Sequence, residues 1–556
     1  MKKLLIGISC FLSLLSCQPK PTPPINAAVV SARQEASEIG LQIIREGGNA
    51  FDAMVATSLA LTVVYPIAGN ITGGGFMVYR LADGTTHSLD YREAAPGEAN
   101  KELFLDRIGN VLPQKSTLGG LAVGVPGAIA GILDTHEALG TMSLKELILP
   151  AIRLAREGFV VTPKQAKTLN RYRHLFIQVN GPDTFYAYPY KAGDTIKNPA
   201  LARALETIAE NGKKGFYEGW IAQVMVKKTQ QTGGILSLED LKSYQTQWRE
   251  PIRFSYKDLT ISSMAPPSSG GICLGQMFQM IEPYDLGKMG HHSVESIHLM
   301  AEVERRSYAD RNHFLGDPDF VNIPTLSLLD SSYLQERMRS YDRKHATPSE
   351  EIAHGKVSWR ESEETTHFSI LDSQGNAVAV TTTLNGAYGS KVFVDEIGVF
   401  MNNEMDDFSS KPGIPNMFGL TGSEANSIAP RKRMLSSMAP TIVEKNEKLY
   451  MVLGTPGGST IITSVFQTIL NVYEHGMNIQ EAIDAPRFHH QWLPDQITFE
   501  PRAFPPDIIQ SLQNMGHKIS EQNTRIIGKV NGILVNPNGK IQVGADPRGD
   551  DTAATY

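Results

Sequence analysis

Two segments in the last third of the chain carry a high density of hydroxyl side chains at strand-like spacing. Residues 365–371 and 377–384 are β-branched runs, a composition typical of β-strands. Ser373-Gln374-Gly375-Asn376 separates them and has the composition of a turn. The two segments are therefore predicted to form a β-hairpin, which brings hydroxyls of both strands together at its open end.

The register of this hairpin decides which polar side chains meet. If Asp372 faces Ala377 across the turn, Thr383 and Asn385 end near Thr365, and a slip of one or two residues keeps them there. Ordinary strand propensity explains the same threonines without any chemistry, because Thr is common in strands. The hairpin is thus a candidate site that needs support from other segments.

Two charged segments are candidates for binding groups of opposite sign. Residues 402–408 hold three carboxylates, among them Glu404 and Asp407, which repel one another unless a cation such as a substrate ammonium lies between them. Arg92 lies between a strand-like segment and Pro96, and its guanidinium is suited to bidentate binding of a carboxylate. The alternatives are a solvated acidic turn and a surface salt bridge.

Hydroxyl and backbone N–H groups complete the candidates. Ser436 and Ser437 offer two hydroxyls beside apolar residues. The segment 454–459, which contains Gly457 and Gly458, follows a predicted strand and opens a predicted helix, so its N–H groups could face an anion. Glycine turns at such junctions are common, and this motif alone is a weak signal.

Several common kinds of site lack their motifs. The chain has no Gly-x-Ser-x-Gly, no phosphate-binding loop and no His-Glu-x-x-His. The pairs His291-His292 and His489-His490 direct neighbouring rings to different faces, so we expect no metal ion and no cofactor. With 52 basic and 58 acidic residues among 556, the net charge of −6 provides no basic field for nucleic acid.

The amino end has the features of an export signal. Met1-Lys2-Lys3 precedes an apolar stretch that is too short to span a bilayer permanently. Leu14-Leu15-Ser16-Cys17 resembles the lipobox of bacterial lipoproteins, in which the cysteine is acylated. We expect residues 1–16 to be a signal peptide and 17–26 a Pro-rich tether of an exported, periplasmic, membrane-anchored protein. Plain signal cleavage, with Cys17 incidental, is the alternative.

Apolar periodicity predicts the elements that must position these side chains. The predicted helices are 37–46, 51–64, 143–157, 199–210, 216–230, 238–243, 294–312 and 460–474, and residues 126–345 are predicted to be mainly helical. The predicted strands are 76–79, 365–371, 377–384, 448–453 and a last hairpin near 525–545. Because no linker separates the helical and strand-rich parts, they are predicted to form one interwoven α/β fold.

Taken together, these motifs resemble the γ-glutamyltranspeptidase (glutathione hydrolase) family of the N-terminal-nucleophile hydrolase superfamily. The resemblance extends over residues 27–556. Its motifs are Asp90-Tyr91-Arg92-Glu93, Thr365-Thr366-His367, Asn402 to Phe408, Leu435-Ser436-Ser437-Met438, Pro456-Gly457-Gly458-Ser459, Arg487 to Trp492 and Asp546-Pro547-Arg548. It implies an α/β (α+β) fold, a four-layer αββα sandwich that the two subunits of a self-cleaved precursor form jointly.

The resemblance also implies how the precursor matures. Cleavage between Glu364 and Thr365 would divide the chain into a large subunit, 27–364, and a small catalytic subunit, 365–556. The cut would give Thr365 a free α-amine with an ordinary pKa near 8, so that one residue supplies both nucleophile and base.

The family pattern assigns a role to each candidate residue. Thr365 attacks the γ-glutamyl carbonyl, Thr383 hydrogen-bonds it, and the N–H groups of Gly457 and Gly458 stabilise the oxyanion. It assigns binding of the substrate α-carboxylate to Arg92, Ser436 and Ser437. Binding of the α-ammonium is assigned to Asn385, Glu404 and Asp407. Residues 411–420 resemble a lid over the site, with Phe418 where several relatives have Tyr.

The implied activity is hydrolysis or transfer of the γ-glutamyl group of glutathione and related compounds, with water, amino acids or peptides as acceptors. Two alternatives stay open. One is a related amidase of the cephalosporin acylase or poly-γ-glutamate depolymerase type, and the other is an inactive lipid-anchored binding protein. The full set of ligand-binding residues disfavours the first, and the intact Thr365 and glycines disfavour the second.

Overall fold

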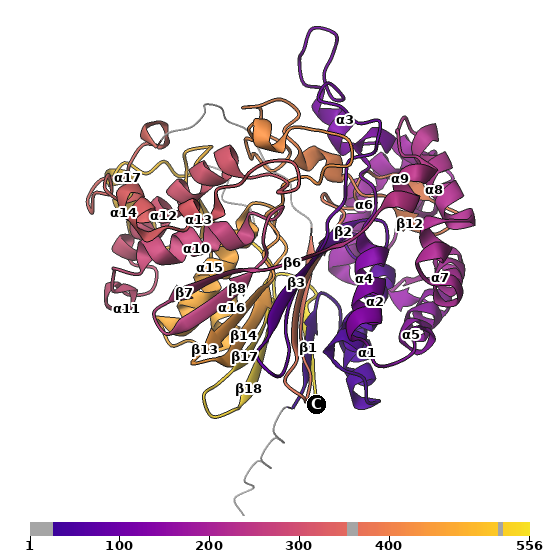
Figure 1. The fold of residues 1–556 in the computed structure, drawn as a ribbon, viewed down its shortest axis with the longest axis horizontal. Helices are drawn as coiled ribbons and strands as arrows, with labels where there is room; N and C mark the ends of the chain where they lie inside the picture. Colours follow the sequence, from indigo (N-terminus) through magenta and orange to yellow (C-terminus); the bar gives the residue numbers. More distant parts are fainter. Residues whose placement is uncertain (1–25, 353–364, 521–525) are drawn as a thin grey trace, which may run out of the picture.

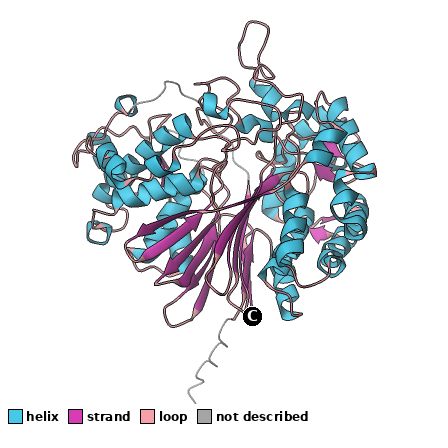
Figure 2. Ribbon diagram, in the orientation of Figure 1, coloured by secondary structure: helices cyan, strands magenta, loops and turns pink. Residues whose placement is uncertain are grey.

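Four layers make up the protein. The structure, a computed structural model, describes residues 26–352, 365–520 and 526–556. Two antiparallel β-sheets pack face to face, and helices cover the outer side of each sheet (Figures 1 and 2). The predicted αββα sandwich is therefore confirmed.

The first sheet interleaves segments from both predicted subunits. Its seven strands lie in the order β19-β1-β9-β10-β2-β3-β6. They are Thr552–Thr555 (β19), Ala28–Ser31 (β1), Thr366–Leu371 (β9), Ala377–Thr383 (β10), Gly74–Arg80 (β2), Thr86–Tyr91 (β3) and Gln247–Arg249 (β6). Because β9 and β10 lie between β1 and β2, neither part of the chain could complete this sheet alone.

The second sheet has six strands in the order β18-β17-β14-β13-β8-β7. They are Ile541–Ala545 (β18), Asn531–Val535 (β17), Lys448–Gly454 (β14), Thr441–Lys445 (β13), Leu259–Ser263 (β8) and Ile252–Tyr256 (β7). Residues 126–345 are mainly helical, as predicted, but they also contribute the strands β6, β7 and β8, which were not predicted from the sequence. These strands have only three to five residues each, so their alternating pattern is too short to stand out among helices.

The helices divide between the two outer layers, as Figure 1 shows. Beside the first sheet lie Gln34–Arg45 (α1), Ala50–Val64 (α2), Ala128–Leu139 (α4), Leu144–Glu157 (α5), Pro163–Asn180 (α6), Pro199–Tyr217 (α7), Trp220–Gln231 (α8) and Leu238–Ser243 (α9). Beside the second lie Gly270–Ile281 (α10), Leu286–Met289 (α11), Val294–Phe314 (α12), Thr325–Leu328 (α13), Ser331–Arg337 (α14), Thr460–Tyr473 (α15), Ile479–Asp484 (α16) and Pro506–Asn514 (α17).

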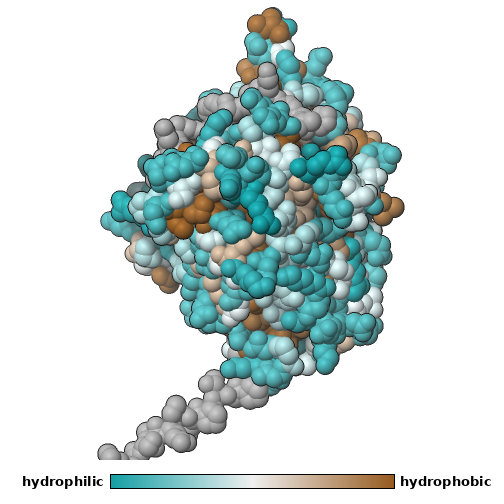
Figure 3. Space-filling model, turned by 90° about the vertical axis from the view of Figure 1, so that its left-hand side faces the viewer, coloured by the Kyte–Doolittle hydropathy of each residue, from teal (hydrophilic) through white to brown (hydrophobic). Residues whose placement is uncertain are grey.

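Shorter elements complete the chain. They are the helix Pro113–Thr117 (α3) and the two-stranded pairs Phe159–Val160 (β4) with Thr195–Ile196 (β5), Phe393–Val394 (β11) with Val399–Phe400 (β12), and Phe488–His489 (β15) with Thr498–Phe499 (β16). The face drawn in Figure 3 is mostly hydrophilic, with apolar groups in small patches. Among the described residues, no helix combines the length and apolar character needed to cross a membrane.

The first sheet is buried on both faces, so its strands hold apolar residues at successive positions. On β1, Val30 belongs to the core between the sheets, whereas Val29 belongs to the core beneath the helices. Val78 and Met77 divide in the same way on β2. Each such side chain contributes about 1.5–3 kcal/mol when fully buried, so the sheet is held from both sides.

The central hairpin forms as predicted, but its register differs by one residue. Leu371 pairs with Ala377, whereas the sequence analysis placed Asp372 opposite Ala377. The turn is tighter, because the Asp372 N–H donates to the Asn376 carbonyl at 3.1 Å and Gly375 takes a left-handed φ of 96°. This three-residue loop moves every pair on one strand by one position.

Candidate active site

Thr365 and Thr383 meet at the open end of the β9–β10 hairpin. Thr382 pairs with Thr366, and the next position outward brings Thr365 Oγ1 within 3.3 Å of Thr383 Oγ1. The Thr383 oxygen also accepts the Asn385 N–H at 2.7 Å, which holds its hydroxyl beside Thr365. The prediction that these three residues lie close together is confirmed, and Thr365 is only 4% exposed.

Arg92 follows β3 and is buried against the acidic segment. Its Nη1 pairs with Glu404 and its Nη2 with Asp407, both within the 3₁₀ turn Glu404–Asp407. The cation and the acids were predicted to bind opposite ends of a ligand, whereas they contact one another directly in the structure. A guanidinium and carboxylates enclosed together compensate each other's lost hydration, which explains the direct contact.

Burial disfavours the ionised forms of the carboxyl groups in this site. Glu93 lies beside Arg92, 3.7 Å from its Nη1, and neither of its carboxylate oxygens accepts a hydrogen bond from the described part of the chain. Burial raises the pKa of Glu93 to about 7, although Arg92 opposes the shift. Burial also raises the pKa of Glu404 and of Asp407. A further cation would stabilise these carboxylates.

The two predicted serines lie next to the arginine. Arg92 Nε donates to the Met434 carbonyl at 3.3 Å, and its Nη2 donates to the Leu435 carbonyl at 3.3 Å. The backbone is thereby held so that Ser436 and Ser437 follow directly beside the guanidinium. Both serines are more than nine-tenths buried.

Gly457 and Gly458 form the turn between β14 and α15. Both have left-handed backbone conformations, with φ of 141° and 54°. The ring of Phe418 packs on this turn so closely that a Cβ at position 458 would lie 2.5 Å from its Cδ1. A glycine is therefore required at position 458 both by conformation and by space.

One cavity collects ten of the eleven residues predicted for catalysis, substrate binding and the lid. They are Arg92, Thr365, Thr383, Asn385, Glu404, Asp407, Phe418, Ser436, Ser437 and Gly458. Gly457 adjoins this set through the chain but does not line the cavity. The predicted cleavage residue Glu364 and the predicted lipidation site Cys17 lie outside the described residues.

Four further residues line the cavity wall: Arg311, Leu420, Met438 and Ile461. Leu420 belongs to the predicted lid segment 411–420, and the other three were given no role. Leu420, Met438 and Ile461 are apolar and close the wall. Arg311 is different, because it brings a second buried guanidinium to the serines. In the sequence it is one charged residue among many on a predicted helix, and no motif singles it out.

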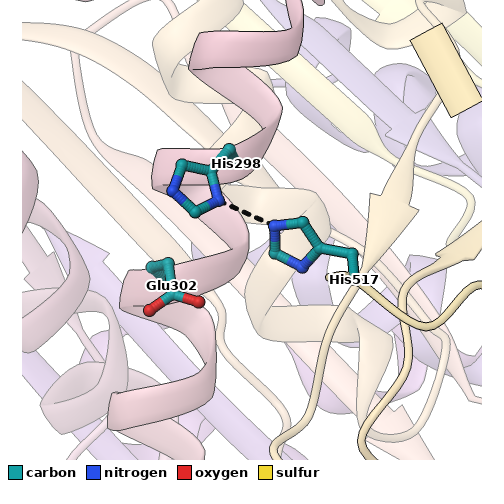
Figure 4. Close-up of side chains that lie close together, drawn as sticks. All are labelled: His298, Glu302 and His517. Atoms are coloured by element: carbon teal, nitrogen blue, oxygen red, sulfur yellow. Dashed lines mark hydrogen bonds between the residues drawn. The ribbon is translucent and has the colours of Figure 1, made fainter. Parts of the chain in front are cut away.

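A second polar cluster includes two side chains of α12. Among the described residues, it is the one group of three side chains that could together bind a metal ion. His298, Glu302 and His517 are buried with ligand atoms within 4.8 Å of one another (Figure 4). His298 Nε2 lies 2.8 Å from the Asp342 carbonyl, which only accepts, so this nitrogen carries the proton. His298 Nδ1 then accepts from His517 Nε2 at 2.7 Å.

Glu302 is also engaged without any ion. It accepts from Arg306 Nη1 at 2.6 Å and from Thr347 Oγ1 at 2.7 Å, and Arg305 Nε lies 3.4 Å away. Despite burial, the two arginines lower the pKa of Glu302 to about 2. A cation would have to displace these donors and sit beside two guanidiniums, so the cluster is better suited to joining elements than to holding a metal.

Comparison with known proteins relates this geometry to a family. The family model for gamma-glutamyltranspeptidase matches residues 36–556. A glutathione hydrolase proenzyme of Escherichia coli K12 is 42% identical over 99% of this chain and 98% of its own length.

Two solved structures are similar as well. A cephalosporin acylase from Bacillus halodurans superposes with a TM-score of 0.82 at 25% identity and covers 98% of this chain and 99% of its own. A gamma-glutamyltranspeptidase from Helicobacter pylori is 42% identical with a TM-score of 0.57, over 58% of this chain and 94% of its own.

Proposed function

The chain belongs to the γ-glutamyltranspeptidase family and is an enzyme, and from this premise we propose that it cleaves itself before Thr365 and then hydrolyses or transfers the γ-glutamyl group of glutathione. The observation that carries the proposal is the single cavity in which the Thr365 hydroxyl faces Arg92, the acidic turn and the two serines. The name of the Escherichia coli relative includes both the substrate and the proenzyme state.

Self-cleavage begins at the Glu364–Thr365 bond. The Thr365 hydroxyl oxygen attacks the carbonyl carbon of Glu364, and the C–N bond breaks to leave an ester and a free amine on Thr365. Water then hydrolyses the ester, which releases the carboxyl end of a large subunit, 27–364, and the amino end of a small subunit, 365–556. The length match with the Helicobacter pylori chain, which covers 58% of this sequence, supports a division of this kind.

Substrate binding uses the two polar sides of the cavity. The α-carboxylate of a γ-glutamyl donor binds to Arg92, Ser436 and Ser437, since guanidinium and hydroxyl groups donate to carboxylates. The α-ammonium binds to Asn385, Glu404 and Asp407. Three carboxyl groups, including Glu93, lie near two guanidiniums in this region, and burial raises the pKa of each, so an entering ammonium would stabilise their ionised forms.

Acyl transfer follows at Thr365. Its hydroxyl loses a proton to its own α-amine, directly or through water, and attacks the γ-carbonyl. Thr383 orients the nucleophile, and the N–H groups of Gly457 and Gly458 stabilise the oxyanion, each worth roughly 3 kcal/mol in comparable sites. The amine leaves, and water or an acceptor amine then releases the γ-glutamyl group from the ester.

The segment around Phe418 serves as the lid. Its ring covers the Gly457-Gly458 turn and lines the cavity, so it excludes water from the acyl group. Phe lacks the hydroxyl that Tyr would add at this position. Closure therefore depends on apolar contact and on the Asn416 amide, which donates to Asp407 at 3.1 Å.

Acylase activity is the second candidate, because a cephalosporin acylase shares the whole fold at a TM-score of 0.82. The 42% identity to a glutathione hydrolase proenzyme and the joint presence of Arg92, Ser436 and Ser437 favour the γ-glutamyl substrate.

Export and lipid anchoring form the last part of the proposal. Residues 1–16 act as a signal peptide, Cys17 receives the lipid, and residues 17–26 tether the enzyme to a membrane facing the periplasm. The support is the lipobox-like sequence alone.

Mass spectrometry and kinetics of the purified protein test the proposal. We expect two chains, of which the smaller begins with Thr365, and a lipid-modified Cys17 at the start of the larger. Glutathione should release glutamate at a measurable rate. An uncut chain, or a smaller fragment that begins elsewhere, would contradict the assignment of the nucleophile.

A further inference from the structure

Arg311 is a buried cation whose donors all point to neutral oxygens. It lies near the end of α12, is 4% exposed and lines the cavity. Its Nε donates to Ser269 Oγ at 2.9 Å, its Nη1 to Asn312 Oδ1 at 3.1 Å and its Nη2 to Ser437 Oγ at 3.0 Å. Within the described ranges it forms no ion pair, in contrast to Arg92 and Arg306.

The contact with Ser437 fixes the direction of that hydroxyl. A guanidinium only donates, so Ser437 Oγ accepts from Arg311 and must direct its own proton elsewhere. Ser437 and Arg92 line the same cavity, so the proton is available to an acceptor held there. A hydroxyl with this polarity is suited to an anion and poorly suited to a donor group.

The same guanidinium supports Ser436 through an intermediate residue. Ser269 Oγ accepts from Arg311 Nε and donates to the Ser436 carbonyl at 2.7 Å. The Ser436 hydroxyl itself accepts from the Met438 N–H at 3.1 Å. Each serine hydroxyl oxygen therefore accepts one hydrogen bond. The donor to Ser437 is a side chain, which a substitution can remove, whereas the donor to Ser436 is a backbone N–H.

We propose that Arg311 is a positioning residue for the α-carboxylate of the donor substrate, because it holds Ser437 as a hydrogen-bond donor and adds a second positive charge at that end of the cavity. The proposal rests on the proposed function. Arg311 acts through Ser437, whereas Arg92 contacts the carboxylate itself. Specificity for a free α-carboxylate then depends on two arginines, one on each side of the Met434–Ser437 segment.

The first test separates binding from chemistry. Arg311→Met keeps most of the length of the side chain but removes the charge and all three hydrogen bonds. For a γ-glutamyl anilide we expect KM to rise about 10–100-fold with kcat changed less than about threefold, the size of a lost hydrogen bond to a charged group. For the matched anilide without the α-carboxylate, KM should change less than about threefold.

A double-mutant cycle identifies the partner. If Arg311 acts through Ser437, Arg311→Met should raise KM at least about fivefold less in a Ser437→Ala background than in the wild type. Ser436→Ala is the matched control, since its hydroxyl is held by a backbone N–H, and there the two effects should multiply. Equal effects of Arg311→Met in the wild-type and Ser437→Ala backgrounds would overturn the proposal, as would equal losses for both anilides.

A conservative variant keeps the test decisive if Arg311→Met prevents folding or cleavage. Arg311→Lys retains the charge but only one directed donor, so we expect cleaved protein with a KM between those of the wild type and Ser437→Ala. A KM unchanged from the wild type would overturn the role of Arg311. Failure of the wild-type protein itself to act on γ-glutamyl anilides would instead contradict the proposed function, so the two failures are distinguishable.

Discussion

Two buried clusters of charge, one around Glu302 and one at the catalytic cavity, differ in how their charges are balanced. Around Glu302, the carboxylate is matched by Arg305 and Arg306 and accepts from Thr347 as well. At the catalytic cavity, Glu404 and Asp407 line the wall together with Arg92 and Arg311. Glu93 lies behind them beside Arg92, and neither of its oxygens accepts a hydrogen bond from the described residues. In the first cluster the carboxylate is matched by two cations, whereas the second holds more carboxyl groups than guanidiniums, and burial there raises the pKa of all three carboxyl groups.

The difference shows how burial separates structural from functional charges. An unpaired buried carboxylate is costly, because it loses hydration without gaining donors. A fold has no reason to keep such a group unless a ligand supplies the missing partner. This difference agrees with the proposal that a substrate ammonium binds beside Glu404 and Asp407, whereas the cluster around Glu302 joins α12 to the loops that follow it.

The largest effect should come from the nucleophile. Thr365→Ala removes the hydroxyl that would both cut the chain and attack the substrate, so we expect one uncut chain and a loss of turnover of at least about 1,000-fold. Gel electrophoresis and glutathione hydrolysis measure the two outcomes.

Thr366→Ala is the matched control for that variant. The Thr366 hydroxyl is buried, and it makes no hydrogen bond to the described residues. Its removal should leave cleavage and turnover within about threefold of the wild type. If the Thr366 variant fails as completely as the Thr365 variant, the hairpin end acts as a structural unit and the nucleophile is not identified.

Much of the fold could be predicted because it depends on long periodic segments. The ranges 143–157 and 238–243 agree with α5 and α9 to within a residue. The hairpin was predicted from β-branched runs, and its register was wrong by one because a loop of three residues and one of four leave similar sequence signals. The strands β7 and β8 were missed because they are short, and because β8 joins the sheet by pairing with β13, far along the chain.

Site residues could be predicted where they belong to a short sequence motif. They could not be predicted where their role depends on a contact between segments far apart in the chain. Arg92, Ser436 and Ser437 belong to short segments with recognisable chemistry. Arg311 lies in a predicted helix, and only folding shows that it is 3.0 Å from Ser437, 126 positions away. The pairing of Arg92 with Glu404 was missed for a related reason, since sequence gives charges without their separation.

Removing the carboxylate of the Glu302 cluster should lower the stability of the fold and leave catalysis nearly unchanged. Glu302→Gln leaves Arg306 buried without its carboxylate, whereas Arg305 keeps its pair with Asp495. Removal of one partner from a buried pair costs about 3–5 kcal/mol of unfolding free energy. Urea unfolding measures the loss. At a temperature where the variant is folded, kcat/KM should stay within about threefold of the wild type.

Glu295→Gln on the same helix is the control, because that side chain is exposed. It should change the unfolding free energy by less than about 0.5 kcal/mol. If Glu302→Gln lowered kcat/KM and left stability intact, the division between the two clusters would be wrong.

Removing Arg92 from the charged cluster at the catalytic cavity should change which donor substrates bind tightly. Arg92→Ala deletes the group that would bind the α-carboxylate and leaves Glu404 and Asp407 without their guanidinium. We expect KM for a γ-glutamyl donor to rise about 100-fold, a loss of about 2.7 kcal/mol. A donor without the α-carboxylate should lose less than about fivefold, and equal losses would mean that Arg92 supports structure only.

The smallest effect concerns Glu93 and the sign of its pH dependence. An unfolded Glu titrates near 4.5, whereas burial raises the pKa of Glu93 to about 7 in the fold. The folded state therefore binds the proton more tightly, and the stability that this gives is full below about pH 4.5 and is lost as pH rises through 7. Glu93→Gln cannot lose a proton, so its melting temperature should exceed that of the wild type by a margin that grows between pH 5 and 8, on the order of 2 kcal/mol in stability.

A bound γ-glutamyl ligand sharpens this last test. Its ammonium would favour ionised Glu93 and lower the pKa of that carboxyl, so the ligand should reduce the pH-dependent loss of stability in the wild type. In Glu93→Gln the ligand should raise the melting temperature by a similar amount at each pH. The measurement is the melting temperature from pH 5 to 8 with and without saturating ligand. Parallel curves for the wild type and Glu93→Gln would show that Glu93 is not the carboxyl group whose pKa the ligand lowers. The contrast with the Glu302 cluster would then depend on Glu404 and Asp407 alone.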